Sequence, residues 1–468
     1  MPQLAPAAHA SAPPHGAGGR ATLAVTATAT AVALMNYTAP MLTLPDMAVA
    51  FGTPASAQAW LLNGTPLGLA VLLLVAGSLA DAHGRRRVFL LGTLALGLTT
   101  ALGALAGSTL TFTLARVAQG AASAAVLAGS LGLLAHAYPA GRDRIRATGI
   151  WGASVSGGIA LGPLLAGALS LADWRLAYGV LGAAALATAA IGARRLPYDK
   201  PEPHRQGRRP DIAGATTLGL ALAALLTALT LGRDGWLRPQ VGLLLLTSAA
   251  LTAAFAAVEH RSRTPMVELA LLRRPAFLAS VLGALFTGLA VIGLFSVVPA
   301  LLQGGAGMSP LGAAWLFVLW SGTAFVVALQ ARRLAARLSA PYQLTLGFAL
   351  SAAGILALLG SIEGGPWPRL LPGLLLAGAG SGLLNAALPR LAVDSVPPER
   401  AAMGSGANNT ARYIGSSAGV ALTLALGPAG PDTALLVSAG LAATGAALTL
   451  VLARGHRSGT SVAQTTSR

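Results

Sequence analysis

The chain has 468 residues, of which 54% are hydrophobic and only 10% are charged, against roughly 25% charged residues in a soluble domain. This composition excludes an ordinary soluble protein, and the basic residues behind the net charge of +17 lie between apolar runs, which excludes nucleic-acid binding as their role. No cysteine is present and the seven histidines are scattered, so we expect no disulfide, metal site or cofactor.

Fourteen apolar stretches are long enough to cross a membrane as helices. In chain order they are 22–44, 57–79, 87–107, 109–137, 146–168, 174–194, 211–231, 239–258, 277–302, 309–331, 342–361, 368–390, 404–427 and 432–453. Their apolar runs are continuous and do not alternate with polar residues, which indicates helices rather than a barrel. The sequence therefore predicts an all-α polytopic membrane protein with fourteen transmembrane helices.

Two longer basic connections divide these spans into groups of six, two and six. The expected parts are a disordered tail 1–21, an N-terminal six-helix bundle 22–194, a linker 195–210, two extra helices 211–258, a linker 259–276, a C-terminal six-helix bundle 277–453 and a tail 454–468. Paired six-helix halves are typical of transporters that rock about a central site.

The basic residues predict the orientation of the chain. With both termini placed inside, 25 of the 31 basic residues lie in inside segments and 4 lie in outside loops. We therefore expect both termini in the cytoplasm and an attraction of the inner face to anionic lipid. Arginine makes up all but one of the basic residues, as in GC-rich bacterial genomes, which suggests a bacterial plasma membrane.

The stretch GSLADAHGRRRV, residues 77–88, joins the second and third spans. The first glycine would let two helices touch, the second permits a tight turn, and the acid can pair with an arginine or accept hydrogen bonds at a helix start. We interpret the cluster as a conformational latch made of Gly77, Asp81, Gly84, Arg85 and Arg86. A simple positive-inside anchor is the alternative interpretation.

Two further motifs lie within spans four and five. LARVAQGAASA, residues 114–124, places Arg116 and Gln119 inside the membrane, where an arginine normally faces a cavity or a partner. GGIALGPLLAG, residues 157–167, combines a proline that kinks the helix with small residues that form a close-packing seam. The residues of this second motif are Gly158, Gly162, Pro163 and Gly167.

These three motifs, in this order, resemble those of the major facilitator superfamily. WRLAYGV at 174–180, EHRSRTPMVELALLRRPAFL at 259–278 and VPPERAAMGSGANNTARYIGS at 396–416 resemble its fourteen-span drug:proton antiporter branch, the EmrB/QacA type. The resemblance implies a major facilitator fold, a conformational role for residues 77–88, and an association of the motif at 157–167 with antiporters that export drugs.

Polar and aromatic residues inside the spans are the candidates for a substrate cavity, because drug-sized pockets combine apolar walls with a few polar groups. They are Asn36, Tyr37, Trp60, Asn63, Arg116, Gln119, Trp151, Asn385, Asn409 and Arg412. Such a cavity would suit neutral or anionic amphipathic compounds better than cations. The alternative for each asparagine is a hydrogen bond between neighbouring helices.

Proton coupling does not follow directly from the sequence. All fourteen acidic residues lie in the expected loops or at span ends. Members of the resembled branch often carry an acid in span one, where this chain has Asn36, and asparagine cannot titrate. Asp46, at the outer end of span one, is the best remaining candidate for a proton site, followed by His136.

The function that we expect is alternating-access export of small amphipathic organic compounds by a monomer, driven by protons, without catalytic residues. A proton-independent facilitator or importer of a small organic solute is the alternative. A polytopic membrane enzyme is disfavoured because the outer loops are too short to form a catalytic domain.

Overall fold

The computed structural model describes residues 17–138, 142–197, 212–232, 235–262, 269–335, 338–363, 366–396 and 401–465, and all regular secondary structure within these ranges is helical. Nine apolar helical stretches in them are long enough to cross a membrane: Arg85–Ala104, Thr109–Ala137, Arg146–Leu169, Arg175–Arg195, Pro239–Arg261, Pro275–Gly305, Pro310–Ala331, Trp367–Asp394 and Pro431–Arg454. Two shorter apolar helical stretches are Thr216–Leu229 and Ala340–Leu356. The count of fourteen spans stays a prediction.

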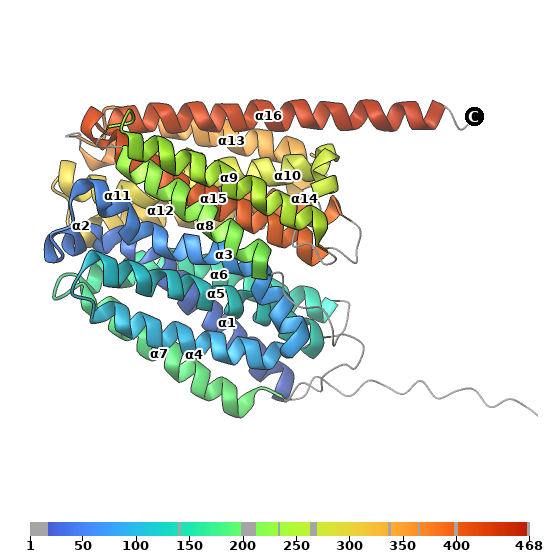
Figure 1. Cartoon of the computed structure of the whole chain (residues 1–468), viewed down its shortest axis with the longest axis horizontal. Coiled ribbons are helices and arrows are strands. Elements are labelled where there is room, and N and C mark those ends of the chain that lie inside the picture. Colours follow the sequence, from blue (N-terminus) through green and yellow to red (C-terminus); the bar gives the residue numbers. More distant parts are fainter. Residues whose placement is uncertain are drawn as a thin grey trace, which may run out of the picture.

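The first group of helices packs side by side along the long axis of the molecule (Figure 1). It comprises α1 (Ala17–Thr38), α2 (Pro40–Ala50), the short η1 (Ala55–Ala57), α3 (Gln58–His83), α4 (Arg85–Ala104), α5 (Thr109–Ala137), α6 (Arg142–Leu169) and α7 (Arg175–Arg195). We call this group the N-terminal half.

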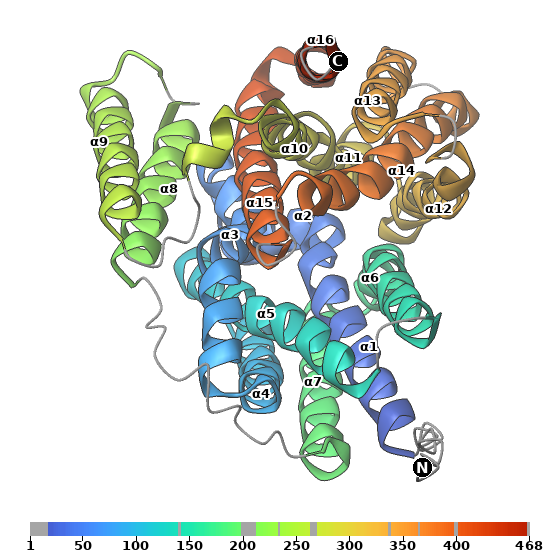
Figure 2. The same cartoon turned by 90° about the vertical axis from the view of Figure 1, so that its right-hand side faces the viewer.

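The second group begins with the pair α8 (Ile212–Gly232) and α9 (Pro239–Arg261). The C-terminal half follows and comprises η3 (Leu269–Arg273), α10 (Pro275–Phe286), the π-helical η4 (Thr287–Ile292), α11 (Gly293–Gly305), α12 (Pro310–Ala335), α13 (Ala340–Leu356), η5 (Trp367–Arg369), α14 (Leu370–Asp394), α15 (Ala401–Leu426), η7 (Gly427–Ala429) and α16 (Pro431–Thr465). Viewed along the helices, the two halves face each other, with α3 opposite α15 and α6 opposite α12, while α8 and α9 lie to one side (Figure 2).

Two expected boundaries differ from the structure. The first expected span, 22–44, is divided into α1 and α2 at Pro40, because a proline has no N–H to continue the helical hydrogen bonds. Residues 454–465 of the tail expected at 454–468 are part of α16, which continues to Thr465.

Glycines bring the helix backbones into contact. A Cβ atom at Gly158 of α6 would lie 2.5 Å from the Ala31 carbonyl oxygen of α1, and one at Gly162 would lie 2.7 Å from the Met35 carbonyl oxygen. Close approach of this kind holds helices together in lipid, where no hydrophobic force acts between them. The small residues of the motif at 157–167 therefore hold α6 against α1.

The two halves are joined near one end only. We call the end at which α1 begins and α7 ends, with Arg85–Arg87 and Arg194 and Arg195, the basic end, and the opposite end the α2 end. Within the described residues, four hydrogen bonds join the halves: Gln303 Nε2 to the Leu42 carbonyl oxygen (3.1 Å), Asn63 Nδ2 to the Ser417 carbonyl oxygen (3.0 Å), Tyr37 Oη with Ser416 Oγ (3.2 Å), and Thr410 Oγ1 to the Ala70 carbonyl oxygen (3.3 Å). All four lie at mid-depth or toward the α2 end.

Toward the basic end the helices of the two halves leave open space. A Cβ atom at Gly77, near the end of α3, or at Gly149 or Gly152, near the start of α6, would meet no atom within 4 Å. Among the described residues, no atom occupies the space beside Gly77, so the helix contact expected there is not formed in this conformation. In this conformation, hydrogen bonds join the halves at mid-depth and toward the α2 end, and space remains beside these three glycines toward the basic end.

The tight seam between α6 and α1 predicts a stability difference between two alanine variants of α6. Gly162→Ala places a methyl group against the Met35 backbone and should reduce the free energy of unfolding by about 1–3 kcal/mol. Gly152→Ala is the matched control and should leave stability unchanged or raise it, since it removes a helical glycine without a clash. Thermal unfolding of both purified variants measures this, and equal melting temperatures would contradict the packing described for Gly162.

Candidate functional site

A fully buried arginine lies at the centre of the N-terminal half. Arg116 of α5 is 0% exposed. Its Nη1 atom donates to the Asn36 carbonyl oxygen at 2.7 Å, to Asn36 Oδ1 at 2.9 Å and to Gln119 Oε1 at 2.7 Å, and its Nη2 atom donates to the Tyr37 carbonyl oxygen at 3.3 Å. All four acceptors are neutral oxygens, so the charge is held by dipoles of α1 and α5.

The local sequence explains this position. Pro40 has no N–H, so the Asn36 carbonyl oxygen, four residues earlier, lacks its usual helical donor and is free to accept from Arg116. Gly64 of α3 permits the approach from the other side, because a Cβ atom there would lie 2.6 Å from Cβ of Arg116. A proline on α1 and a glycine on α3 thus prepare the site of one buried cation.

Helix α4 completes the network. Asn36 Nδ2 donates to Thr100 Oγ1, and Gln119 Nε2 donates to the Thr99 carbonyl oxygen at 3.0 Å. Thr100 Oγ1 in turn donates to the Leu96 carbonyl oxygen at 2.6 Å. No carboxylate among the described residues forms an ion pair with Arg116, and its Nε atom is buried without a hydrogen-bond partner.

Three residues that the sequence placed in the substrate cavity therefore lie elsewhere in this conformation. Asn36, Arg116 and Gln119 are at most 1% exposed and bond to each other inside the N-terminal half. The physical reason is that a buried guanidinium needs several oxygen acceptors, and α1, α4 and α5 supply them. Asn36 instead forms hydrogen bonds between neighbouring helices, to Thr100 of α4 and Arg116 of α5, which is the alternative interpretation for each asparagine.

Tyr37 and Asn63 lie at the junction between the two halves. The Tyr37 hydroxyl contacts Ser416, and the Tyr37 ring meets the Tyr413 ring edge-on at a centroid distance of 6.0 Å. Asn63 Nδ2 donates to the Ser417 carbonyl oxygen, while its Oδ1 atom is buried without a partner. These contacts close the space between the halves from mid-depth toward the α2 end.

The remaining cavity candidates are distributed over both halves. Trp60 is partly buried on α3, and Trp151 of α6 donates from Nε1 to Thr30 Oγ1 of α1 at 2.9 Å, which ties these two helices together. Asn385 is exposed on α14. Asn409 and Arg412 are partly buried on α15, where Arg412 Nη2 donates to Asn409 Oδ1 at 3.0 Å.

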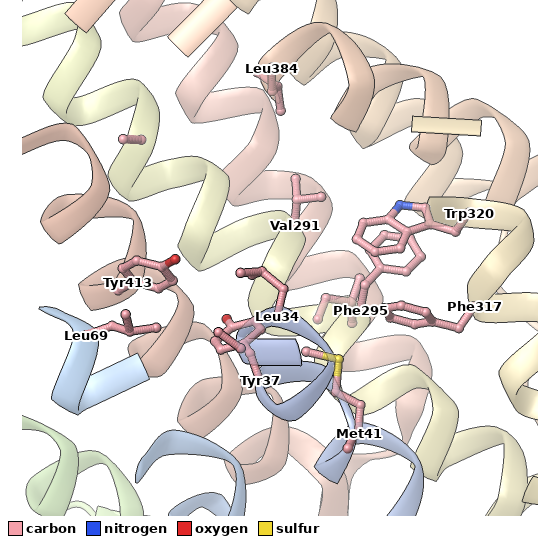
Figure 3. Close-up of a cluster of buried hydrophobic side chains, with 14 of the residues drawn as sticks. Leu34, Tyr37, Met41, Leu69, Val291, Phe295, Phe317, Trp320, Leu384 and Tyr413 are labelled. Carbon is pink, nitrogen blue, oxygen red and sulfur yellow. The ribbon is translucent and has the colours of Figure 1, made fainter. Parts of the chain in front are cut away.

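An apolar aromatic cluster lines the C-terminal half. Phe295 of α11 stacks on Trp320 of α12 with centroids 4.5 Å apart and planes at 7°, and Phe317 meets Trp320 at 5.2 Å. Figure 3 shows these rings together, with Val291 and Leu384 of the same half and Leu34, Tyr37 and Met41 of the other. A flat wall of this kind suits an aromatic or aliphatic ligand.

Sequence reasoning missed several polar partners. Thr99 and Thr100 accept hydrogen bonds from the Arg116 network. The Ser416 hydroxyl is hydrogen-bonded to Tyr37, and Ser280 accepts two hydrogen bonds from Asn408 Nδ2, each at 2.9 Å. Serine and threonine are common in transmembrane helices and usually bond their own backbone, so the sequence carries no signal that separates these from the others.

Described hydrogen bonds tie the predicted latch to α5 and to the end of α7. Gly84 adopts φ +93° at the turn between α3 and α4. Arg85 Nη1 donates to the Gly132 carbonyl oxygen of α5 at 3.4 Å, and Arg86 donates to the carbonyl oxygens of Leu196 and Ala193 at the end of α7. The side chain of Asp81 lies outside the described residues. The latch role stays a prediction.

The two candidate proton sites lie outside the hydrogen-bonded network of Arg116. Asp46 is partly buried on α2, two residues beyond the expected end of the first span. Burial raises the pKa of its carboxyl group, and the nearby charge of Asp173 raises it further. His136 is exposed near the end of α5.

Two facing helical halves that enclose a polar junction, in a chain rich in apolar helices, define a membrane transporter. The model of the Major Facilitator Superfamily matches residues 26–420, and the chain belongs to this superfamily. It is not an enzyme but a transporter, as its relatives are. The predicted all-helical major facilitator fold is confirmed.

Several proteins with similar sequences are named as drug-resistance or transport proteins. The chain is 32% identical to the multidrug resistance protein Stp of Mycobacterium tuberculosis over 81% of this chain and 70% of that protein. It is 33% identical to the puromycin resistance protein pur8 of Streptomyces alboniger, with coverage of 86% and 80%, and 31% identical to a probable actinorhodin transporter of Streptomyces coelicolor, with coverage of 94% and 79%. The crystal structure of a peptide transporter, POT, shares the fold with a TM-score of 0.70 at 15% identity, covering 92% of this chain and 94% of that one.

The Arg116 network predicts that removal of its main acceptor destabilises the protein. Asn36→Leu deletes an oxygen acceptor of Arg116 and a donor to Thr100, and should reduce the free energy of unfolding by about 1–3 kcal/mol. Asn385→Leu on the exposed face of α14 is the control and should have little effect. If thermal unfolding shows equal stability for the two variants, the network does not hold α1 against α5.

Proposed function

We propose that this protein exports small amphipathic organic compounds across the bacterial plasma membrane by alternating access. The superfamily and the names of relatives, which include multidrug and puromycin resistance proteins, support this proposal. We further propose that the chain belongs to the fourteen-span branch and that its basic end, with both termini, faces the cytoplasm. The excess of arginine at that end supports this orientation.

One observation carries the proposal: the halves are joined at mid-depth and toward the α2 end, and are apart at the basic end. With the basic end inside, this is the state that receives a compound from the cytoplasm or from the inner leaflet. Loading from the inside is the first step that an exporter needs.

Export then requires the opposite arrangement of the halves. The hydrogen bonds of Tyr37, Asn63 and Gln303 across the junction break, and the halves close at the basic end, where Gly77 offers open space for an approaching helix. A residue with a side chain at Gly77 would limit that approach. In this scheme the segment 77–86 latches the outward-open state.

The second candidate function is a proton-independent facilitator. It is favoured by the neutral partners of Arg116, because no carboxylate in the described network can carry a proton at that depth. A facilitator needs the same rocking of the halves but moves its substrate only down a gradient.

Export predicts lower accumulation of some compounds in cells. A drug-sensitive bacterial host that expresses the protein should accumulate less of several amphipathic dyes or antibiotics than a host that expresses Arg116→Met at the same membrane level. The variant should be inactive, since it leaves Asn36 and Gln119 without their shared donor. Equal accumulation in the two strains across a broad panel would count against export.

Proton coupling predicts a role for Asp46. Because burial raises the pKa of this carboxyl, it holds a proton at a higher pH than an ordinary aspartate, and acidification of the outer side should stimulate export by the wild type. Asp46→Asn should remove this pH dependence in a pH-jump assay with proteoliposomes. Wild-type flux that persists downhill without a pH gradient, and is unchanged in the variant, would instead favour the facilitator.

A further inference from the structure

One face of α15 carries a stripe of polar side chains at helical spacing. Ser405, Asn409, Arg412 and Ser416 follow each other at intervals of four, three and four residues and so share a face. They are bonded in sequence, since Asn409 Nδ2 donates to the Ser405 carbonyl oxygen at 3.0 Å and Arg412 Nη2 donates to Asn409 Oδ1 at 3.0 Å. The first three are partly buried, and Ser416 is fully buried.

The other faces of α15 are already occupied. Asn408 bonds Ser280 of α10, and Thr410 bonds the Ala70 carbonyl oxygen of α3. A Cβ atom at Gly419 would lie against the backbone of η4 and α11, 3.0 Å from Cα of Gly293. Ser416 at one end of the stripe is buried against Tyr37, whereas Ser405, Asn409 and Arg412 remain partly exposed beside these neighbours.

Arg412 has more donors than the protein uses. A guanidinium carries five N–H groups, and within the described residues the bond to Asn409 is the only one that Arg412 makes. Its Nε atom is shielded from solvent and has no partner, and no described carboxylate pairs with it. The Tyr413 ring, 5.4 Å from the guanidinium carbon, provides a cation–π contact but accepts no hydrogen bond in the plane of the guanidinium.

Arg412 and Arg116 differ in how many of their N–H groups are hydrogen-bonded. Arg116 reaches three residues through four hydrogen bonds and is 0% exposed, so it has little capacity for a ligand. Arg412 remains partly exposed and is nearly unbonded. Partial burial of an unpaired guanidinium costs desolvation free energy, which a negatively charged ligand can offset.

The stripe is closed toward the α2 end and open toward the basic end. Tyr37 of the N-terminal half covers the Ser416 end of the stripe, because its hydroxyl contacts Ser416 and its ring meets the Tyr413 ring edge-on. Figure 3 shows Tyr37 between Tyr413 on one side and the rings of Phe295 and Trp320 on the other. A ligand that enters from the basic end would thus meet Arg412 beside two aromatic rings.

A second unpartnered donor belongs to the same half. Trp320 is 8% exposed, and its Nε1 atom is buried without a hydrogen-bond partner. In Figure 3 the indole nitrogen is on the side of the ring turned toward Val291 and Leu384, away from Phe317. An indole N–H and a guanidinium only donate, so a ligand that satisfies them must offer acceptor oxygens.

We propose that Arg412, with Asn409 and Tyr413, forms an anion subsite of the C-terminal half that binds the carboxylate or phenolate group of an aromatic amphipathic substrate, with Trp320 as a second donor to the same class of compound. The subsite rests on the proposed transport function and names its substrate class. The phosphate of an anionic lipid headgroup offers similar acceptor oxygens, and the test separates the two sources.

The test is direct binding to the purified full-length chain in nanodiscs of neutral lipid, by isothermal titration calorimetry. The probes are 1-naphthoate and its uncharged isostere 1-naphthamide. The wild type should bind the anion at least about tenfold more tightly than the amide, as expected for charge-assisted bonds to a guanidinium. Arg412→Gln should abolish this preference and leave amide binding unchanged, and Arg412→Lys should retain a reduced preference.

Arg390→Gln is the matched control, because Arg390 is a partly exposed arginine on α14 beside Asp394 and should not affect the preference. Binding of 1-naphthamide and the melting temperature report whether each variant is folded. If Arg412→Gln does not fold, Trp320→Phe serves in its place and should weaken the binding of 1-naphthoate severalfold. Equal wild-type affinity for both probes, or an intact preference in Arg412→Gln, would overturn the proposal.

A lipid arm completes the experiment. Phosphatidylglycerol added to the nanodiscs should leave naphthoate binding unchanged if the subsite takes a substrate, and competition that abolishes naphthoate binding would overturn the substrate assignment in favour of a lipid. Because binding is measured without transport, a failure of the export assay with an intact anion preference refutes the proposed export alone. Export without any anion preference refutes the subsite alone.

Discussion

Close contact between helix backbones is the constraint on which the rest of the structure depends. In lipid, helices gain nothing from hiding apolar side chains from each other, so packing at glycine replaces the hydrophobic effect. Gly68 and Gly120 bring α3 against α5, Gly162 brings α6 against α1, and Gly288 brings η4 against α15. The glycines make each half a compact body, and the junction between the halves combines apolar packing of α3 on α15 and of α6 on α12 with a few polar bonds.

The same contacts determine where charge can be held. Because Gly64 lets α3 approach α5, Arg116 is sealed among neutral oxygens of α1 and α5, one of which is available only because Pro40 lacks an N–H. Arg412 has no comparable set of acceptors on α15. The two arginines therefore have different chemistry: Arg116 stabilises a bundle, and Arg412 has N–H donors without partners among the described residues.

The polar part of the junction between the halves is small. Four hydrogen bonds of 3.0–3.3 Å join the halves within the described residues, and each contributes about 0.5–1.5 kcal/mol net. Their sum is a few kcal/mol, and the apolar packing of α3 on α15 and of α6 on α12 adds to it. The π-helical η4 lies beside this junction against α15, and such segments are frequent at functional sites.

The sequence by itself determined the apolar helices, the two similar halves and the superfamily, because hydropathy and the motifs at 77–88, 114–124 and 157–167 are local properties of the chain. Only the tertiary structure decided the roles of the polar residues. Asn36 and Arg116 are 80 positions apart, and Tyr37 and Ser416 are 379 apart, so no local pattern reveals that they meet. A buried polar group takes the partner that helix packing brings to it, and that packing, not the chain order, gave Arg116 four hydrogen bonds and Arg412 one.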